Sequence, residues 1–126
     1  MDFLKRDYTI LVVEIRFLSA SEFSDAVRRN GGAVLGPATR VSEALALIET
    51  ARCDGALLDV HLGMGETVFP VAERLYAEGI AFVFVTGCEE DFGKPYGDEP
   101  VLRKPFGEAE LDRCLRMLMG RVLRAT

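Results

Sequence analysis

Short apolar segments alternate with amphipathic segments along the chain, and this alternation limits the fold more than any other feature of the sequence. Residues 8–13 (YTILVV) form a continuous run, not one in which apolar and polar residues alternate. Such runs are typical of strands that are covered on both faces. The sequence therefore predicts an α/β domain in which a doubly wound parallel sheet carries helices on both faces. The five predicted strands are residues 8–13, 33–35, 56–58, 80–85 and 100–102.

The segments between these strands have helical periodicity. In residues 41–51, the apolar residues Val41, Ala44 and Ile48 recur at the spacing of one helix face. Residues 87–99 (GCEEDFGKPYGDE) have no such stripe, so the fourth helix expected there is short or disordered, a loop or a frayed turn. Glycine and proline at 36–37 should end the second strand. The predicted helices are residues 19–30, 41–51, 66–78 and 108–123.

The size and charge of the chain restrict the number of its domains and the kinds of partner that it can bind. Its 126 residues fit a single domain, residues 1–126. The net charge is −5 and no cluster of Lys and Arg stands out, which argues against nucleic acid or an anionic membrane as a partner. No run approaches the roughly 18 apolar residues of a membrane span, and the N-terminus does not read as a signal peptide. Three widely spaced cysteines indicate a reducing compartment, so we expect a cytoplasmic protein.

Polar side chains follow four of the predicted strands at the point where each strand ends. The first strand ends at Glu14, the third at Asp59, the fourth at Thr86 and the fifth at Lys104. In an open α/β sheet, ligands bind beyond the carboxyl ends of the strands. We therefore expect these four side chains to converge on one edge. Each of them alone is equally explained as a turn residue, a helix cap or a solvated charge, and only the combination is specific.

Three of these positions lie in recognisable patterns. One apolar run precedes Asp59, another precedes Thr86 and a glycine, and a third precedes Lys104, proline and phenylalanine. In this order they resemble the receiver domain of two-component response regulators, over residues 8–124. The resemblance implies a flavodoxin-like five-stranded sheet with strand order 2-1-3-4-5. It also implies a single-domain regulator that takes a phosphoryl group from a histidine kinase and signals by protein–protein interaction or acts as a phosphate shuttle or sink.

The resemblance assigns a role to each of these residues. Asp59 is the expected phosphoacceptor, since a carboxylate is a nucleophile toward an activated phosphoryl donor. Lys104 and Thr86 are expected to place a cation and a hydroxyl group on the phosphoryl oxygens. The bond between Lys104 and Pro105 is commonly cis in this family. Such a protein is not an enzyme, although it assists its own aspartyl phosphorylation and dephosphorylation.

The expected metal site departs from the family pattern. Receivers usually carry two adjacent acids after the first strand, but here Ile15 follows Glu14. Mg²⁺ requires oxygen ligands, which an isoleucine side chain does not have. We therefore expect Glu14, Asp59 and the backbone carbonyl of His61 to hold Mg²⁺ more weakly than a standard receiver does. The side chains of His61 and Cys88 are expected to flank the phosphorylated site.

A subfamily and an unusual switch are also suggested. Residues 84–88 (FVTGC) resemble the FATGUY variant of stand-alone receivers from alphaproteobacteria, although Glu89 stands where that motif has tyrosine. Partners in that group are sensor histidine kinases of the HWE or related classes, together with a downstream protein or phosphotransfer partner. Val101 stands where receivers usually carry a switch aromatic. An order–disorder change in residues 87–99 is the expected replacement.

Two alternatives to a phosphorylated regulator remain open. One is a phosphorylation-independent, receiver-like protein-binding module, which Ile15 and Val101 favour and the intact Asp59, Thr86 and Lys104 oppose. The other is a flavodoxin-like enzyme or cofactor binder, which lacks the phosphate-binding loop expected after the first strand.

Overall fold

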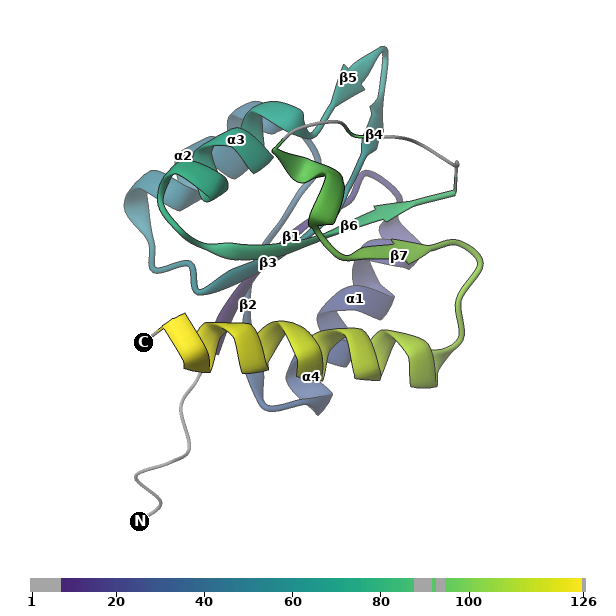
Figure 1. Ribbon diagram of the computed structural model, residues 1–126. Coiled ribbons are helices and arrows are strands. Elements are labelled where there is room, and N and C mark those ends of the chain that lie inside the picture. The colour runs from purple at the N-terminus through teal and green to yellow at the C-terminus, as the bar shows by residue number, and fades with distance from the viewer. Residues whose placement is uncertain (1–7, 88–91, 93–94, 126) are drawn as a thin grey trace.

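The computed structural model describes residues 8–87, 92 and 95–125, and a five-stranded parallel sheet lies at its centre (Figure 1). The strand order is β2-β1-β3-β6-β7. This confirms the predicted order 2-1-3-4-5, because β4 and β5 form a separate hairpin. The strands of the central sheet are β1 (Tyr8–Val13), β2 (Gly32–Ala38), β3 (Gly55–Asp59), β6 (Ala81–Thr86) and β7 (Val101–Arg103).

Helices cover both faces of this sheet, as predicted (Figure 1). α2 and α3 pack on the face that carries Leu11 and Val13, and α1 and α4 pack on the face that carries Ile10 and Val12. Successive residues of a strand point to opposite faces. A strand covered on both sides therefore needs apolar residues at every position, which explains the continuous run in β1. The helices are α1 (Phe17–Arg29), α2 (Val41–Thr50), α3 (Phe69–Ala77) and α4 (Glu108–Ala125).

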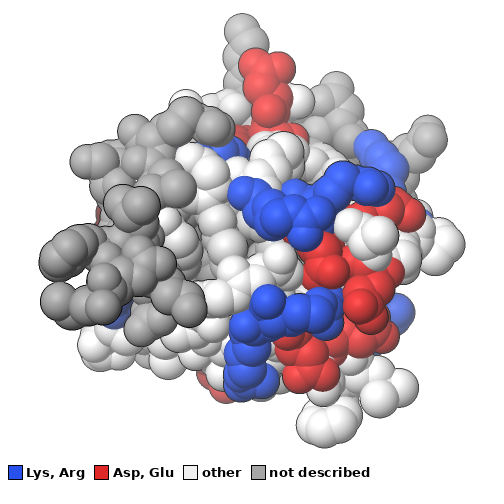
Figure 2. All heavy atoms as spheres, turned by 90° about the horizontal axis from the view of Figure 1, so that it is seen from below, with Lys and Arg blue, Asp and Glu red and all other residues white. Residues whose placement is uncertain are grey.

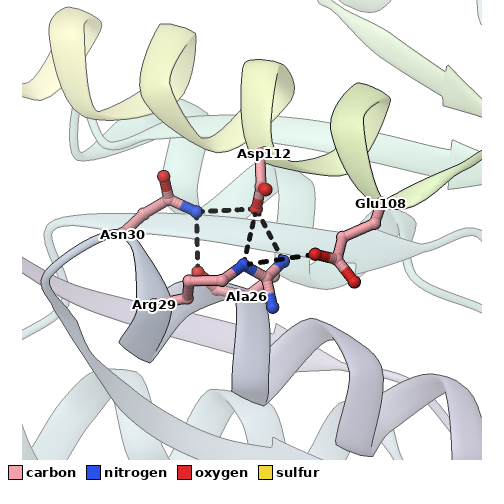
Figure 3. Close-up of polar contacts among 5 residues, drawn as sticks. All are labelled: Ala26, Arg29, Asn30, Glu108 and Asp112. Carbon is pink, nitrogen blue, oxygen red and sulfur yellow. Dashed lines mark hydrogen bonds and ion pairs between the residues drawn. The ribbon is translucent and has the colours of Figure 1, made fainter.

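A polar cluster joins α1 to the first turns of α4 (Figure 3). Nη2 of Arg29 lies 2.6 Å from Oδ1 of Asp112, and Nδ2 of Asn30 donates to the same oxygen at 2.9 Å. Hydrogen bonds from Arg29 and Asn30 hold the pKa of Asp112 below its usual range. Figure 2 shows acidic and basic side chains beside one another on the face that α4 covers. The cluster thus fixes the start of α4, at Glu108, against α1.

The second strand is longer than predicted. β2 continues through the glycine and proline at 36–37 and ends at Ala38, so the prediction that it stops at Leu35 was wrong. β2 lies at the edge of the sheet, where the missing N–H of a proline interrupts no ladder of hydrogen bonds. Gly36 has a φ of +96°, and the pairing with β1 shifts by one residue between Leu11 and Val13. This bulge carries Ala38 to the level of Glu14.

A β-hairpin was missed by the sequence analysis. β4 (His61–Gly63) and β5 (Glu66–Thr67) pair as antiparallel strands, and α3 begins only at Phe69. The prediction of a helix from Glu66 was therefore wrong. Gly63, Met64 and Gly65 all have positive φ, at +87°, +53° and +77°. The two glycines adopt such angles without steric cost, so these three residues make a tight hairpin turn.

The segment between β6 and β7 contains no α-helix among its described residues. These are Gly87, Phe92 and residues 95–100, and they include a short 3₁₀ helix, η1 (Tyr96–Asp98). Residues 88–91 and 93–94, on which part of the loop prediction rests, lie outside the described residues. Tyr96 and Phe92 pack on Phe84 of β6, with ring centroids 5.7 Å and 4.6 Å apart. Aromatic side chains of this segment therefore cover β6. No full helix was expected there.

None of the helices in the described part of the chain is long and apolar enough to cross a membrane.

Candidate functional site

Glu14 is buried at the carboxyl end of β1. Its backbone N–H donates to the carbonyl oxygen of Ala38 at 2.9 Å, which fixes it beside the bulge of β2. The residue is 0 % exposed, and neither carboxylate oxygen has a hydrogen-bond partner among the described residues. Burial, and next the nearby carboxyl group of Asp59, raise the pKa of Glu14 to about 8. Glu14 is thus a buried acid whose ordinary form at neutral pH is disfavoured by its surroundings.

Asp59 lies beside Glu14, and Lys104 lies close to both. Asp59 is the last residue of β3 and is buried. Nζ of Lys104 lies 3.5 Å from Oδ1 of Asp59 and 3.7 Å from Oε1 of Glu14. One ammonium group therefore serves two buried carboxylates. The structure brings together three of the residues that the sequence predicted at this edge.

Lys104 and Thr86 are held by the same pair of strands. The N–H of Lys104 donates to the carbonyl oxygen of Thr86 at 2.9 Å, directly after the last ladder pair between Thr86 and Arg103. The bond between Lys104 and Pro105 is cis, as the family resemblance implied. Thr86 is 1 % exposed and ends β6, the strand between β3 and β7. It therefore lies between Asp59 and Lys104 along the edge of the sheet.

His61 lies two residues after Asp59, at the start of the hairpin. It begins β4, pairs with Thr67 across the hairpin, and is exposed. That its imidazole flanks the site stays a prediction. Cys88, the other residue expected there, lies outside the described residues.

The acidic side chains at this edge supply part of the oxygen ligands that a divalent cation needs. Among the described residues no group of three or more His, Cys, Asp and Glu side chains could hold a metal ion. Glu14 and Asp59 supply two carboxylates, and the unpartnered oxygens of Glu14 are the kind of ligand that Mg²⁺ prefers. Ile15, where a third acid was expected, is 46 % exposed. Two carboxylates fit Mg²⁺ when backbone carbonyls or water supply the remaining oxygen ligands.

The contact between the hairpin and the start of α2 was not predicted from the sequence. Oε1 of Glu66, in the hairpin, accepts a hydrogen bond from the N–H of Val41 at the start of α2, at 2.7 Å. The hairpin that follows Asp59 is thus tied to the α2 side of the molecule. The Gly-Met-Gly sequence at 63–65 was the available signal, because glycines at a short interval favour a turn over a helix start.

Solved structures include close matches to this one. SdrG from Sphingomonas melonis Fr1 is 34% identical, with 93% of this chain and 97% of that chain covered and a TM-score of 0.76. A BeF3-activated conformation of SdrG, described as from Pseudomonas melonis Fr1, is 38% identical over 87% and 95% of the two chains, with a TM-score of 0.72. The response regulator PhyR from Brucella abortus is 26% identical over 95% of this chain and 49% of its own, with a TM-score of 0.76.

More distant structures share the fold. A CheY-like response regulator receiver domain from Methanospirillum hungatei JF-1 is 20% identical and has a TM-score of 0.83, with 96% of this chain and 100% of that chain covered. No protein-family model matches the chain, and no curated protein matches it.

Proposed function

This chain belongs to the receiver domains of response regulators, and we propose that it accepts a phosphoryl group from a histidine kinase on Asp59. The observation that carries the proposal is the position of Lys104, whose Nζ lies 3.5 Å from Oδ1 of Asp59 and 3.7 Å from Oε1 of Glu14. A buried acid at the end of a strand, next to a partly exposed cation, suits a group that must attack an incoming phosphoryl group.

The proposed reaction is a transfer between two side chains. An oxygen of Asp59 attacks the phosphorus of the kinase phosphohistidine, the P–O bond forms as the P–N bond breaks, and the histidine nitrogen takes the departing electron pair. The ammonium group of Lys104 stabilises one equatorial oxygen of the phosphoryl group, and the hydroxyl group of Thr86 donates to another. The chain thus assists its own phosphorylation and dephosphorylation, and acts as a signalling protein and not as an enzyme on other substrates.

The same residues would hold Mg²⁺ during this transfer. Glu14, Asp59 and the backbone carbonyl of His61 are the proposed ligands, and binding is weak because Ile15 has no oxygen to contribute. Bound Mg²⁺ neutralises charge on the phosphoryl oxygens. The oxygens of Glu14, which have no hydrogen-bond partner among the described residues, would be available as ligands for the cation.

The wider role follows from the family. The proposed donor is a sensor histidine kinase, of the HWE or a related class if the FATGUY resemblance holds. The phosphorylated domain then contacts a downstream protein or passes the group on as a shuttle or sink. We place this exchange in the cytoplasm, where kinase and regulator domains meet.

Mass spectrometry of the intact protein tests this function. The protein is incubated with acetyl phosphate, with Mg²⁺ and with a chelator, beside the variant Asp59→Asn. We expect the mass of one added phosphoryl group in the wild type and none in the variant. Absence of labelling in every condition would overturn the proposal, and labelling that persists in chelator would show that transfer does not need Mg²⁺.

A second candidate function is a protein-binding module of receiver shape that is never phosphorylated. The exposed apolar side chain of Ile15 at the expected metal site favours it. The same labelling experiment separates the two, because this module would stay unlabelled.

A further inference from the structure

The hairpin of β4 and β5, which follows Asp59, projects from the body of the domain (Figure 1), and the apolar residue Met64 lies in its turn. Met64 is fully exposed, and its φ of +53° lies in the left-handed region, between two glycines that also have positive φ. A non-glycine residue is uncommon in this region, and such positions are often functional. A large apolar side chain held there in solvent contributes nothing to the core, so its place calls for a different explanation.

A hollow of about 450 Å³ lies between this hairpin and the loop before α2. Ile15 contacts the hairpin closely, since a Cβ atom built on Gly63 would lie 3.3 Å from Cδ1 of Ile15. The position that usually carries a metal ligand is therefore used here to build an apolar wall. The hollow is lined by the apolar side chains of Ile15, Leu62 and Met64 and by the polar side chains of Thr39, Arg40 and Glu66.

The backbone around the hollow is held by hydrogen bonds. Glu66 accepts a hydrogen bond from the N–H of Val41 at 2.7 Å, and the N–H of Val68 donates to the carbonyl oxygen of Val60 at 2.9 Å. These bonds tie the hairpin to α2 and to the residue that follows Asp59. A surface that is already ordered loses little conformational entropy when it is covered.

The hollow adjoins the phosphoacceptor. Ile15 directly follows Glu14, and Leu62 lies on the strand that begins two residues after Asp59. A protein that carries a phosphoryl group to Asp59 would approach the residues next to the hollow, whereas a donor as small as acetyl phosphate need not touch it. Arg40 at the rim is exposed and forms no ion pair with another described residue, so an acidic side chain would complement it.

We propose that this hollow receives an apolar side chain, with an acidic neighbour, from the histidine kinase that phosphorylates Asp59. The proposal rests on the proposed function and adds the surface that selects the donor. Met64 and Ile15 hold the apolar group and Arg40 attracts the acid, while the chemistry stays with Asp59, Thr86 and Lys104. The hairpin thus discriminates between protein donors and small donors.

The test compares two donors on the same variants. Asparagine tolerates the left-handed region, so Met64→Asn keeps the hairpin turn while it removes the apolar side chain. Met117→Asn, at another exposed methionine on α4, is the matched control, and Met64→Leu restores the apolar character. Each protein receives phosphoryl groups from acetyl phosphate and from every autophosphorylated histidine kinase of the same organism.

We expect Met64→Asn to lower kcat/KM for transfer from the kinase about tenfold, mainly through KM, as the loss of one buried side chain implies. Labelling by acetyl phosphate should stay within about twofold of wild type, Met117→Asn should match wild type, and Met64→Leu should recover most of the loss. Arg40→Glu should weaken kinase transfer alone, whereas Arg113→Glu on α4 should not.

Three outcomes would overturn the proposal. Transfer from the kinase could be unchanged in Met64→Asn, both donors could slow equally, or no kinase could label a wild-type protein that acetyl phosphate does label. The last result would leave Asp59 as an acceptor and remove the protein donor. If acetyl phosphate also failed to label Asp59, the proposed function itself would be wrong.

Discussion

The ammonium nitrogen of Lys104 lies 3.7 Å from Oε1 of Glu14, a carboxylate that is 0 % exposed and has no hydrogen-bond partner among the described residues. The same nitrogen lies 3.5 Å from Asp59. Two acids thus share one cation at the edge of the sheet. This arrangement has consequences for phosphoryl transfer, for stability and for metal binding.

Replacement of Lys104 by glutamine should slow phosphorylation of Asp59. The side chain keeps its approximate length but loses the charge that stabilises the phosphoryl oxygens, so we expect a loss of about 100-fold in the labelling rate with acetyl phosphate. Intact-mass time courses measure this rate. Arg103→Gln, which removes the adjacent exposed charge, is the control and should have little effect. Equal rates in wild type and Lys104→Gln would show that this cation does not act in transfer.

Glutamine at position 14 should stabilise the metal-free protein at high pH. Burial raises the pKa of Glu14 to about 8 from an ordinary value near 4.5. The folded protein therefore holds a proton that the unfolded chain releases, and the stability from this proton is full below about pH 4.5 and is lost as the pH rises through 8. Glu14→Gln removes this dependence.

Urea unfolding in a chelator measures the effect. The free energy of unfolding of Glu14→Gln relative to wild type should rise between pH 5 and pH 8 by roughly 2 kcal/mol or more, because one pKa unit corresponds to about 1.4 kcal/mol. Glu22→Gln, at an exposed acid on α1, should show no such trend. A constant difference between Glu14→Gln and wild type across this range would contradict the raised pKa.

An acid at position 15 should strengthen Mg²⁺ binding. Ile15→Asp adds a third carboxylate at the place where receivers usually carry one, and we expect the dissociation constant for Mg²⁺ to fall about tenfold or more. Calorimetric titration with Mg²⁺ measures it. Leu18→Asp adds the same charge to an exposed position on α1, which separates coordination from a general electrostatic effect. Similar changes in the two variants would show that Ile15 does not lie at the metal site.

Phosphorylation should alter the protection of the segment before β7 from amide hydrogen exchange. Val101 is not aromatic, so the usual switch side chain is missing, and Tyr96 of η1 is one of the aromatic residues that pack on Phe84. The N–H of Glu99 donates to the carbonyl oxygen of Tyr96 at 3.0 Å, which makes its exchange with solvent a reporter of η1. We expect faster exchange at Glu99 when BeF3⁻ and Mg²⁺ are added. Unchanged exchange there would refute an order–disorder switch in the described part of this segment.

The sequence predicted the helices and strands whose apolar residues follow a regular pattern. β1 and β6 were found from continuous apolar runs, and α4 from Leu111, Leu115 and Leu118, which are buried as expected. The elements that depend on local turns were predicted less well. β2 passes its glycine and proline because it lies at an edge, and no single segment of sequence reveals which strand is outermost.

The site was predicted in its members but not in its geometry. Asp59, Thr86 and Lys104 were identified because strands of a parallel sheet end at the same edge. The hairpin at residues 61–67 was missed because Glu66 and Thr67 were assigned to α3 on apolar spacing alone. Its contact with Ile15 joins two segments that are distant in sequence, and such contacts follow from the packing of the sheet.

The sequence by itself determined the α/β fold and the polar residue that ends each strand, because these follow from hydrophobic period, whereas the order of the strands came from the family resemblance. Only the tertiary structure decided that one ammonium group serves Glu14 and Asp59 together, and that Ile15 forms a wall with the hairpin. Burial and distance set the charge state and the neighbours of a side chain, and both arise only when the strands are assembled.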